Sequence, residues 1–314
     1  MIHKISTKGM SRDEWLQLRQ KTIGGSDAAA IIGLNKWETP YSVWAEKTGR
    51  IAHTEDNEAM RTGRDLEEYV AKRFEEATGK KVRRENNVLY NDQFPFAHAN
   101  IDRIVIGEKA GLECKTTSIL NLSKFHGGDY PDNYYVQCVH YLAVTELERW
   151  YLAVLVLGKG LYTYCIERNQ AEIDALMAAE AEFYQYIEKD LAPEPDGLAA
   201  TTEAIKAIYP NCNMMDEIDL TAVDEDVKAA LALRNEINRL EEIKDGHCNR
   251  IKEYMREAAV GRIEGAKVTW KNQQRKGFNL ERFQAEHPDM NLNGYFDISN
   301  SRIFRIIETK QREA

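Results

Sequence analysis

The residues with the clearest chemical potential are two carboxylates and a lysine, Asp102, Glu113 and Lys115. Glu113 and Lys115 belong to a segment of strand-forming residues, and successive side chains of a strand point to opposite faces of its sheet. Leu112 and Cys114 should therefore point into the core, while Glu113 and Lys115 point together to the other side. A turn precedes this segment, so the strand before it should bring Asp102 opposite them. The spacing predicts a patch of two carboxylates and one ammonium group.

A patch of this composition has two interpretations. Either it forms a cross-strand salt bridge on a solvated face, or it holds a metal ion. The apolar run from Ile101 to Ile106 and the neighbours Leu112 and Cys114 indicate a half-buried position. Carboxylates brought together there repel each other unless a cation lies between them, and hard oxygen ligands favour Mg²⁺ or Mn²⁺ over zinc. The pattern leaves both interpretations open, and its context favours the metal site.

A mixed arrangement of strands and helices must position this patch. Ser11 followed by Glu14 predicts a capping box at the start of one helix, and Ser26 lies near the expected N-cap of a second. Sequence patterns further predict helices at 58–78, 132–145 and 170–189, and strands at 81–90, 96–106, 112–117, 150–157 and 161–167. We therefore expect an α/β protein in which a mixed sheet is flanked by helices.

The bulk properties limit the class of protein. The chain has 314 residues, 43% of them hydrophobic and 30% charged, which suits one large domain or two unequal ones and excludes a disordered chain. Its five cysteines form no CxxC pair, so neither a disulfide framework nor a zinc site is expected. The net charge of −9 argues against a general basic coat for nucleic acid but permits a local basic groove. No segment resembles a signal peptide or a membrane span, and we expect a cytoplasmic protein without a membrane partner.

The domain organisation is indicated by a segment rich in proline and glycine at residues 191–202, which is typical of a linker. We expect a core domain at residues 1–192, a linker at 193–202 and a C-terminal extension at 203–314. The extension should contain a long charged helix at about residues 223–259. From Ala266 onward its tail alternates basic and apolar residues, which predicts short strands.

Several motifs accompany the patch in a defined order. They are Trp15-Leu16-Gln17-Leu18-Arg19 leading into Ile23-Gly24-Gly25-Ser26-Asp27-Ala28, Pro40-Tyr41 with Trp44 and Glu46-Lys47-Thr48-Gly49, Gly63-Arg64-Asp65-Leu66-Glu67, the Asp102…Glu113-x-Lys115 hairpin, and Tyr134 with Gln137. In this order, over about residues 10 to 150, they resemble the YqaJ-type viral recombinases and lambda-exonuclease-like alkaline exonucleases of phages and prophages. That family is a branch of the PD-(D/E)XK nuclease superfamily. The resemblance implies a restriction-endonuclease-like nuclease core with a helical C-terminal extension.

The same resemblance implies metal-ion catalysis at the patch. Asp102, Glu113 and the backbone carbonyl of Cys114 would hold Mg²⁺, with Mn²⁺ as a substitute. The ion would stabilise charge on the scissile phosphate and acidify a bound water. Glu67 would complete this ligand shell or support a second ion, and a register shift of one residue would give that role to Glu68.

Three further side chains are implied in the reaction. Lys115 would position or deprotonate the attacking water, and orienting it is the preferred role because neighbouring carboxylates hold a lysine charged. Tyr134 and Gln137 are three residues apart and share one helix face, and the resemblance implies that they contact the nucleophile or the substrate. Without the resemblance, Tyr134 would be interpreted as a packed core residue, and Gln137 and Glu67 as surface residues.

Arg19 and Ser26 form a second candidate site. A Gly-Gly-Ser sequence that enters a helix offers backbone N–H groups and a hydroxyl, which suits a phosphate, and Arg19 would add a charge-assisted contact. The resemblance implies that the two residues hold the 5′-terminal phosphate of the degraded strand. The alternative is an ordinary N-cap beside a surface arginine.

These expectations describe a deoxyribonuclease that degrades linear double-stranded DNA from its ends in the 5′→3′ direction and leaves 3′ single-stranded overhangs for phage-type recombination. The alternatives are an endonuclease of the same fold, of the restriction or repair type, and a non-catalytic DNA-binding recombination scaffold. The resemblance implies a phage-type single-strand annealing protein as partner and a homotrimeric ring. It also implies a phage or prophage gene expressed in the cytoplasm of a bacterial host cell.

Overall fold

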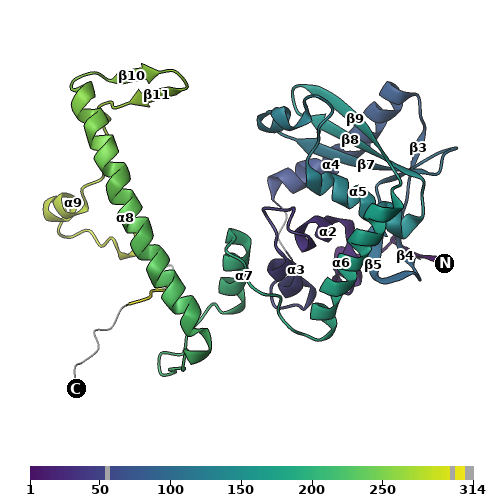
Figure 1. The fold of residues 1–314 in the computed structure, drawn as a ribbon, viewed down its shortest axis with the longest axis horizontal. Coiled ribbons are helices and arrows are strands. Elements are labelled where there is room, and N and C mark those ends of the chain that lie inside the picture. The colour runs from purple at the N-terminus through teal and green to yellow at the C-terminus, as the bar shows by residue number, and fades with distance from the viewer. Residues whose placement is uncertain (54–56, 298–300, 308–314) are drawn as a thin grey trace. The chain divides into compact units, whose positions relative to one another are not determined.

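The structure is a computed structural model that describes residues 1–53, 57–297 and 301–307. The chain divides into two compact units, Met1–Pro210 and Asn211–Ala314 (Figure 1). The elements of the first unit are β1 (Ile2–Ser6), α1 (Arg12–Gln20), β2 (Ile23–Gly24), α2 (Gly25–Ile31), α3 (Pro40–Lys47), α4 (Glu58–Thr78), β3 (Val82–Arg84), β4 (Asn87–Asn91), β5 (Phe94–Asn100), β6 (Arg103–Val105), β7 (Ala110–Thr117), the 3₁₀ helix η1 (Ile119–Phe125), α5 (Asp132–Thr145), β8 (Arg149–Val156), β9 (Gly160–Glu167), α6 (Gln170–Glu188) and α7 (Ala199–Ile208). Those of the second are the 3₁₀ helix η2 (Thr221–Val223), α8 (Asp224–Met255), β10 (Val260–Ile263), β11 (Ala266–Thr269), α9 (Leu280–Glu286) and the 3₁₀ helix η3 (Asn293–Tyr295).

A five-stranded mixed sheet forms the centre of the first unit. Its strand order is β3-β6-β7-β8-β9, in which β7 and β8 are parallel and the other neighbours antiparallel. A second sheet has the order β1-β4-β5-β2, and its strands β2 and β5 are parallel. The prediction of an α/β fold with a mixed sheet and flanking helices is confirmed.

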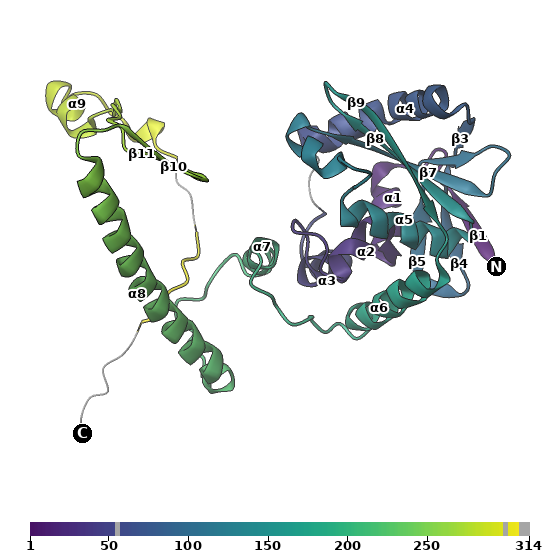
Figure 2. The ribbon, with the colours of Figure 1, turned by 45° about the horizontal axis from the view of Figure 1, so that its top comes forward.

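Strand β8 is buried on both faces, and this divides the core into two layers. Figure 2 shows α4 and α5 on opposite sides of β7 and β8. Trp150 and Leu152 pack in the cluster that contains the apolar residues of α5, whereas Tyr151 and Ala153 pack with those of α4. A strand covered on both faces needs apolar residues at every position, which explains the unbroken apolar run of β8.

Strand β7 has one apolar face and one polar face. Leu112 is buried in the α4 layer with Cys114 packed against it, while Glu113 is hydrogen-bonded to Gln137 of α5 on the other side. The predicted alternation of side chains is therefore confirmed. It places the chemistry of β7 in the space between the sheet and α5.

Two predicted strands are each divided in the structure. Residues 81–90 form β3 in the five-stranded sheet and β4 in the four-stranded sheet, and residues 96–106 form β5 and β6 in the same way. The prediction of a single strand for each segment was wrong, because the chain passes from one sheet to the other within both segments. The second crossing lies at Ile101 and Asp102, between β5 and β6. Asp102 is therefore at a break between strands rather than inside one.

Local capping explains two helix starts. Ser11 accepts a hydrogen bond from the N–H of Glu14 (3.2 Å) and donates its own N–H to the Glu14 carboxylate (2.8 Å), which confirms the predicted capping box. Helix α2 starts after Gly24, whose N–H donates to Oδ2 of Asp27 (2.8 Å). This N–H, which we expected to be open to an anion, is thus already paired, and Ser26 is not the cap.

The first unit extends beyond the expected end of the core at residue 192. Helix α7 packs against α3, with Ala204 in the same apolar cluster as Trp44, and the hydroxyls of Thr39 and Thr201 are 2.7 Å apart. The division at residues 210 and 211 therefore lies after α7, whereas the expected linker covered 193–202. The proline and glycine residues of the linker do not reveal that the next helix returns to the core.

The second unit contains the long helix α8, close to the predicted range of 223–259, followed by the hairpin of β10 and β11. The prediction of strands throughout the tail from Ala266 was wrong beyond β11. Asn279 accepts the N–H of Arg282 (2.9 Å) and so caps the start of α9. Residues 298–300 and 308–314 of this tail lie outside the described residues. Of the helices that the structure describes, none has the length and apolar character needed to cross a membrane.

Candidate active site

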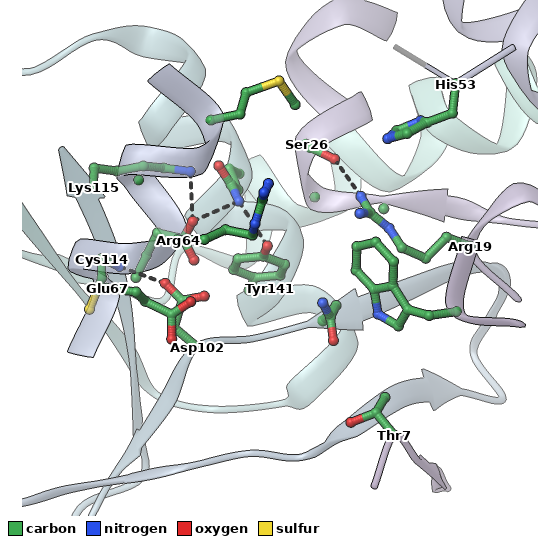
Figure 3. Close-up of a pocket in the computed structure, with 18 of the residues that line it drawn as sticks. Thr7, Arg19, Ser26, His53, Arg64, Glu67, Asp102, Cys114, Lys115 and Tyr141 are labelled. Atoms are coloured by element: carbon green, nitrogen blue, oxygen red, sulfur yellow. Dashed lines mark hydrogen bonds and ion pairs between the residues drawn. The ribbon is translucent and has the colours of Figure 1, made fainter. Parts of the chain in front are cut away.

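One cavity of the first unit, of about 960 Å³, is lined by all the site residues predicted from the sequence (Figure 3). They are Arg19, Ser26, Glu67, Asp102, Glu113, Cys114, Lys115, Tyr134 and Gln137. Figure 3 shows Asp102 and Lys115 on one side of the cavity and Arg19 and Ser26 on the other, with Arg64 between them. The residues of the two candidate sites therefore line one cavity.

Asp102 and Glu113 form its buried acidic part. Oδ2 of Asp102 accepts the backbone N–H of Cys114 (2.8 Å), which fixes the carboxylate against β7. Glu113 is only 4% exposed; its Oε1 accepts from Nζ of Lys115 (2.7 Å) and Nε2 of Gln137 (2.9 Å), while its Oε2 has no partner among the described residues. Burial and the charges of neighbouring carboxylates raise the pKa of Asp102 well above its usual value. The pair is crowded and retains an oxygen that can accept a further partner.

The structure distinguishes Glu67 from Glu68. Glu67 lines the cavity and forms an ion pair with Arg103, whereas Glu68 does not line it. The Glu68 side chain is 69% exposed and pairs with Arg84 (2.8 Å) and Arg103 (3.0 Å). Of the two, only Glu67 faces the same space as Asp102.

The donor atoms determine which metal would fit this site. No group of three or more His, Cys, Asp and Glu side chains in the described part of the chain is placed to hold a metal ion. Asp102, the unpartnered oxygen of Glu113 and the carbonyl of Cys114 would nevertheless form a set of oxygen donors. Mg²⁺ is commonly bound by one or two carboxylates and keeps several waters, so these residues fit it. Glu67 would join them only after leaving Arg103.

Lys115 is held in its charged form. Burial alone would lower the pKa of its ammonium group, but the carboxylates of Glu113 and Asp102 raise it overall. Its Nζ also lies 5.4 Å from the centre of the Tyr134 ring, at which distance the ring face attracts a cation. A charged lysine donates hydrogen bonds and cannot accept a proton, so the geometry favours the orienting role over that of a base.

Helix α5 contributes Tyr141 to the cavity, a residue that was not predicted from the sequence. Nε2 of Gln137 donates to its hydroxyl (2.8 Å) as well as to Glu113. A Cβ atom on Gly25 would lie 2.6 Å from Cε1 of Tyr141, so only glycine lets α2 approach α5 this closely. The spacing of four residues from Gln137 places Tyr141 on the same helix face and was a signal available in the sequence.

Arg19 is held in place by several contacts. Its Nη2 donates to Oγ of Ser26 (3.0 Å), its guanidinium lies 4.4 Å from the centre of the Trp15 ring, and its Nε is buried without a partner among the described residues. Nζ of Lys47 donates to the Arg19 carbonyl (3.1 Å) and pairs with Asp27 (2.6 Å). Burial would raise the pKa of Asp27, but the charges of Lys47 and Arg19 lower it to about 2. Arg19 is thus held in an ordered position, and its Nε–H group can donate to a further acceptor.

The charge of the cavity differs from that of the whole chain. Its lining contains four Lys and Arg side chains, Arg12, Arg19, Arg64 and Lys115, and three carboxylates, Glu67, Asp102 and Glu113. Arg64 is not among the site residues predicted from the sequence, although it lies three residues before Glu67 and so on the same face of α4. A polyanion is compatible with this cavity despite the net charge of −9.

Comparisons with known proteins identify the family and the fold. The profile of the YqaJ-like viral recombinase domain matches residues 14–148. The uncharacterized protein YqaJ of Bacillus subtilis (strain 168) is 40% identical over 288 residues, which are 90% of each chain. The alkaline exonuclease LHK-Exo of Laribacter hongkongensis has a similar fold, with a TM-score of 0.50 and 20% identity over 57% of this chain and 93% of that chain. A phage related exonuclease of Haemophilus somnus 129PT has a TM-score of 0.43 and 15% identity over 56% and 99% of the two chains. The protein belongs to the family of YqaJ-like viral recombinase domains, as its sequence motifs imply.

Proposed function

We propose that the protein is a Mg²⁺-dependent deoxyribonuclease that degrades one strand of linear double-stranded DNA from its 5′ end and leaves 3′ overhangs for recombination. One observation carries the proposal: a single cavity contains both the carboxylate and lysine cluster and the pair of Arg19 and Ser26. An enzyme that cuts within a duplex needs the first group alone. Only an enzyme that starts at an end needs a second group that holds a terminal phosphate.

The residues of β7 and the preceding strand crossing would form the metal site. Asp102, Glu113 and the carbonyl of Cys114 would hold Mg²⁺, or Mn²⁺ in its place. When bound, the ion would supply Lewis acidity at the scissile phosphate and at a water. Glu67 would enter the shell, or support a second ion, only if its ion pair with Arg103 opens.

The remaining residues would orient the reactants. Lys115, which stays charged, would donate to the attacking water or to a phosphate oxygen as negative charge develops. Gln137 would keep Glu113 oriented through its hydrogen bond of 2.9 Å. Tyr134 would hold the ammonium group of Lys115 through its ring face.

Arg19 and Ser26 would bind the 5′-terminal phosphate. The guanidinium has a buried Nε without a partner among the described residues, and its Nη2 already points at the hydroxyl of Ser26. A phosphate beside this pair would receive a bidentate contact from the guanidinium and a third hydrogen bond from the hydroxyl. This second anchor would set the polarity of digestion.

The test is a nuclease assay with Mg²⁺ on linear duplex DNA labelled at the 5′ or the 3′ end. We expect early release of the 5′ label, and faster digestion of 5′-phosphorylated than of dephosphorylated duplex. Rapid cleavage of closed circular DNA would instead indicate an endonuclease. DNA binding without hydrolysis in Mg²⁺ or Mn²⁺ would indicate a non-catalytic scaffold.

The family membership also supports two proposals on assembly. A single-strand annealing protein of the phage type would receive the 3′ overhang, and a homotrimeric ring would keep the enzyme on its substrate. Light scattering of the purified protein measures its oligomeric state directly, and a monomeric mass at working concentration would contradict the proposed homotrimer.

A further inference from the structure

A second groove, of about 350 Å³, adjoins the catalytic cavity. Trp37 and Tyr134 line both, so the two spaces meet at these side chains. Thr117, the last residue of β7, also lines the groove. The groove therefore starts where the strand that carries Glu113 and Lys115 ends, and a chain that leaves the catalytic cavity on this side would enter it.

The charge of this groove is unlike that of the chain as a whole. Its lining contains Lys36 and Lys124 together with three asparagines, and it contains no carboxylate. Neither lysine forms an ion pair with any of the residues that the structure describes. Another cavity of the first unit contains Asp27, Glu38 and Glu46. In a chain with 51 acidic and 42 basic residues, a groove whose only charged side chains are lysines favours an anionic occupant.

The groove also presents an aromatic ring to solvent. Trp37 is 76% exposed, and Nζ of Lys36 lies 4.7 Å from the centre of its ring. Its backbone N–H donates to Oδ1 of Asn35 (3.0 Å), and the amide of Asn35 donates in turn to Glu38 (3.0 Å). The loop that carries the tryptophan is therefore fixed, although the ring itself is uncovered. Lysines that alternate with exposed aromatic rings are the features that bind single-stranded nucleic acid, through its phosphates and its unstacked bases.

We propose that this groove binds single-stranded DNA, namely the strand that is not hydrolysed, as it leaves the catalytic cavity. The proposal rests on the proposed function, since it assumes that digestion leaves a 3′ overhang. The bases of a duplex are stacked on one another and are not available to Trp37. An unpaired strand offers both a base to Trp37 or Tyr134 and phosphates to Lys36 and Lys124.

The experiment compares two fluorescent probes by anisotropy in EDTA, which prevents hydrolysis: a blunt duplex, and the same duplex with a 3′ tail of thymidines. The wild type should bind the tailed probe more tightly. Trp37→Ala and Lys124→Ala should each weaken binding of the tailed probe by about tenfold. Lys124→Ala, which does not line the catalytic cavity, should change binding of the blunt probe little. Lys124→Ala should also reduce the slope of log affinity against log salt by about 0.7. Lys189→Ala, at an exposed lysine that lines neither the cavity nor the groove, is the matched control and should behave as the wild type.

The proposal is overturned if Lys124→Ala keeps the full preference for the tailed probe, or if it weakens both probes equally. A second measurement locates the tail directly. A 5-iododeoxyuridine in the first tail position should photocrosslink to Trp37 or Tyr134, and crosslinks confined to other residues would also refute the groove.

The two hypotheses fail in different ways. If linear duplex is not digested but the tail preference depends on Lys124, the proposed nuclease function fails and the single-strand site stands. If duplex is digested and the tail preference is absent or independent of Lys124, the groove proposal fails alone.

Discussion

Gly25 is the position at which we expect a very small substitution to have a large effect. In Gly25→Ala the added Cβ would lie 2.6 Å from Cε1 and 2.9 Å from Cζ of Tyr141, and 3.2 Å from Cγ of Gln137. Ordinary contact begins at 3.4 Å, so the tyrosine ring must move by roughly 0.8 Å or α2 must move away. Such overpacking of a buried site costs about 1–3 kcal/mol of unfolding free energy.

The displacement would reach the candidate active site through hydrogen bonds. Tyr141 and Glu113 are both partners of the Gln137 amide, so a shifted ring or amide moves the carboxylate. A misplacement of about 1 Å in a catalytic group can lower the rate by roughly 100-fold. We therefore expect Gly25→Ala to lower the melting temperature and to lower the rate of duplex digestion by about this factor.

Gly63→Ala is the matched control, because this glycine lines the same cavity and lies inside α4. Its added Cβ would lie 3.6 Å from Oγ1 of Thr116, which is ordinary contact. Alanine in a helix interior stabilises by roughly 0.5–1 kcal/mol relative to glycine, so this variant should keep its activity and melt slightly higher. If Gly25→Ala matched Gly63→Ala in melting temperature and in digestion rate, the close approach of α2 and α5 would not limit the site.

Three further predictions concern single side chains. Asp102→Asn should keep the fold, because an amide oxygen still accepts the Cys114 N–H. The variant should nevertheless lower turnover by roughly 10²–10³-fold. Wild-type turnover of this variant in Mg²⁺ would contradict the proposed metal site. Arg19→Ala should remove the preference for 5′-phosphorylated over dephosphorylated linear duplex, and an unchanged ratio of the two rates would exclude the phosphate contact. The pKa of Asp27 is lowered from 3.8 to about 2, so its charged form stabilises the fold above about pH 4, and this contribution of roughly 2 kcal/mol is lost as the pH falls toward 2. In urea unfolding, Asp27→Asn should be less stable than the wild type at pH 6, and the difference should shrink below pH 4 and nearly vanish near pH 2. A difference that stays constant over this range would show that Lys47 does not lower this pKa.

Much of the candidate site was predictable because its signals are local. The alternation along β7 separates Leu112 from Glu113 and Lys115 whatever the rest of the chain does, since successive strand residues point to opposite faces. The spacing of Tyr134 and Gln137 likewise places them on one helix face. The capping box of Ser11 and the apolar run of β8 are equally local, and they were sufficient to predict an α/β fold.

The divided strands were not predictable in this way. Residues 81–90 and 96–106 have continuous strand propensity, and only the pairing of distant segments decides where each leaves one sheet for the other. That crossing takes Asp102 out of a strand and turns its carboxylate to the N–H of Cys114. The return of α7 to the core has the same origin, because it depends on apolar contacts with α3 rather than on its own sequence.

The sequence by itself determined which residues can do chemistry and which of them share a strand or helix face, because those relations depend on backbone periodicity. Only the tertiary structure decided that Glu67 rather than Glu68 lines the cavity of Asp102, since the choice depends on which face of α4 packs toward the sheet. It also decided that the Arg19 side chain lines the same cavity as Asp102. Packing between elements far apart in the chain brings these groups together, and no local pattern encodes it.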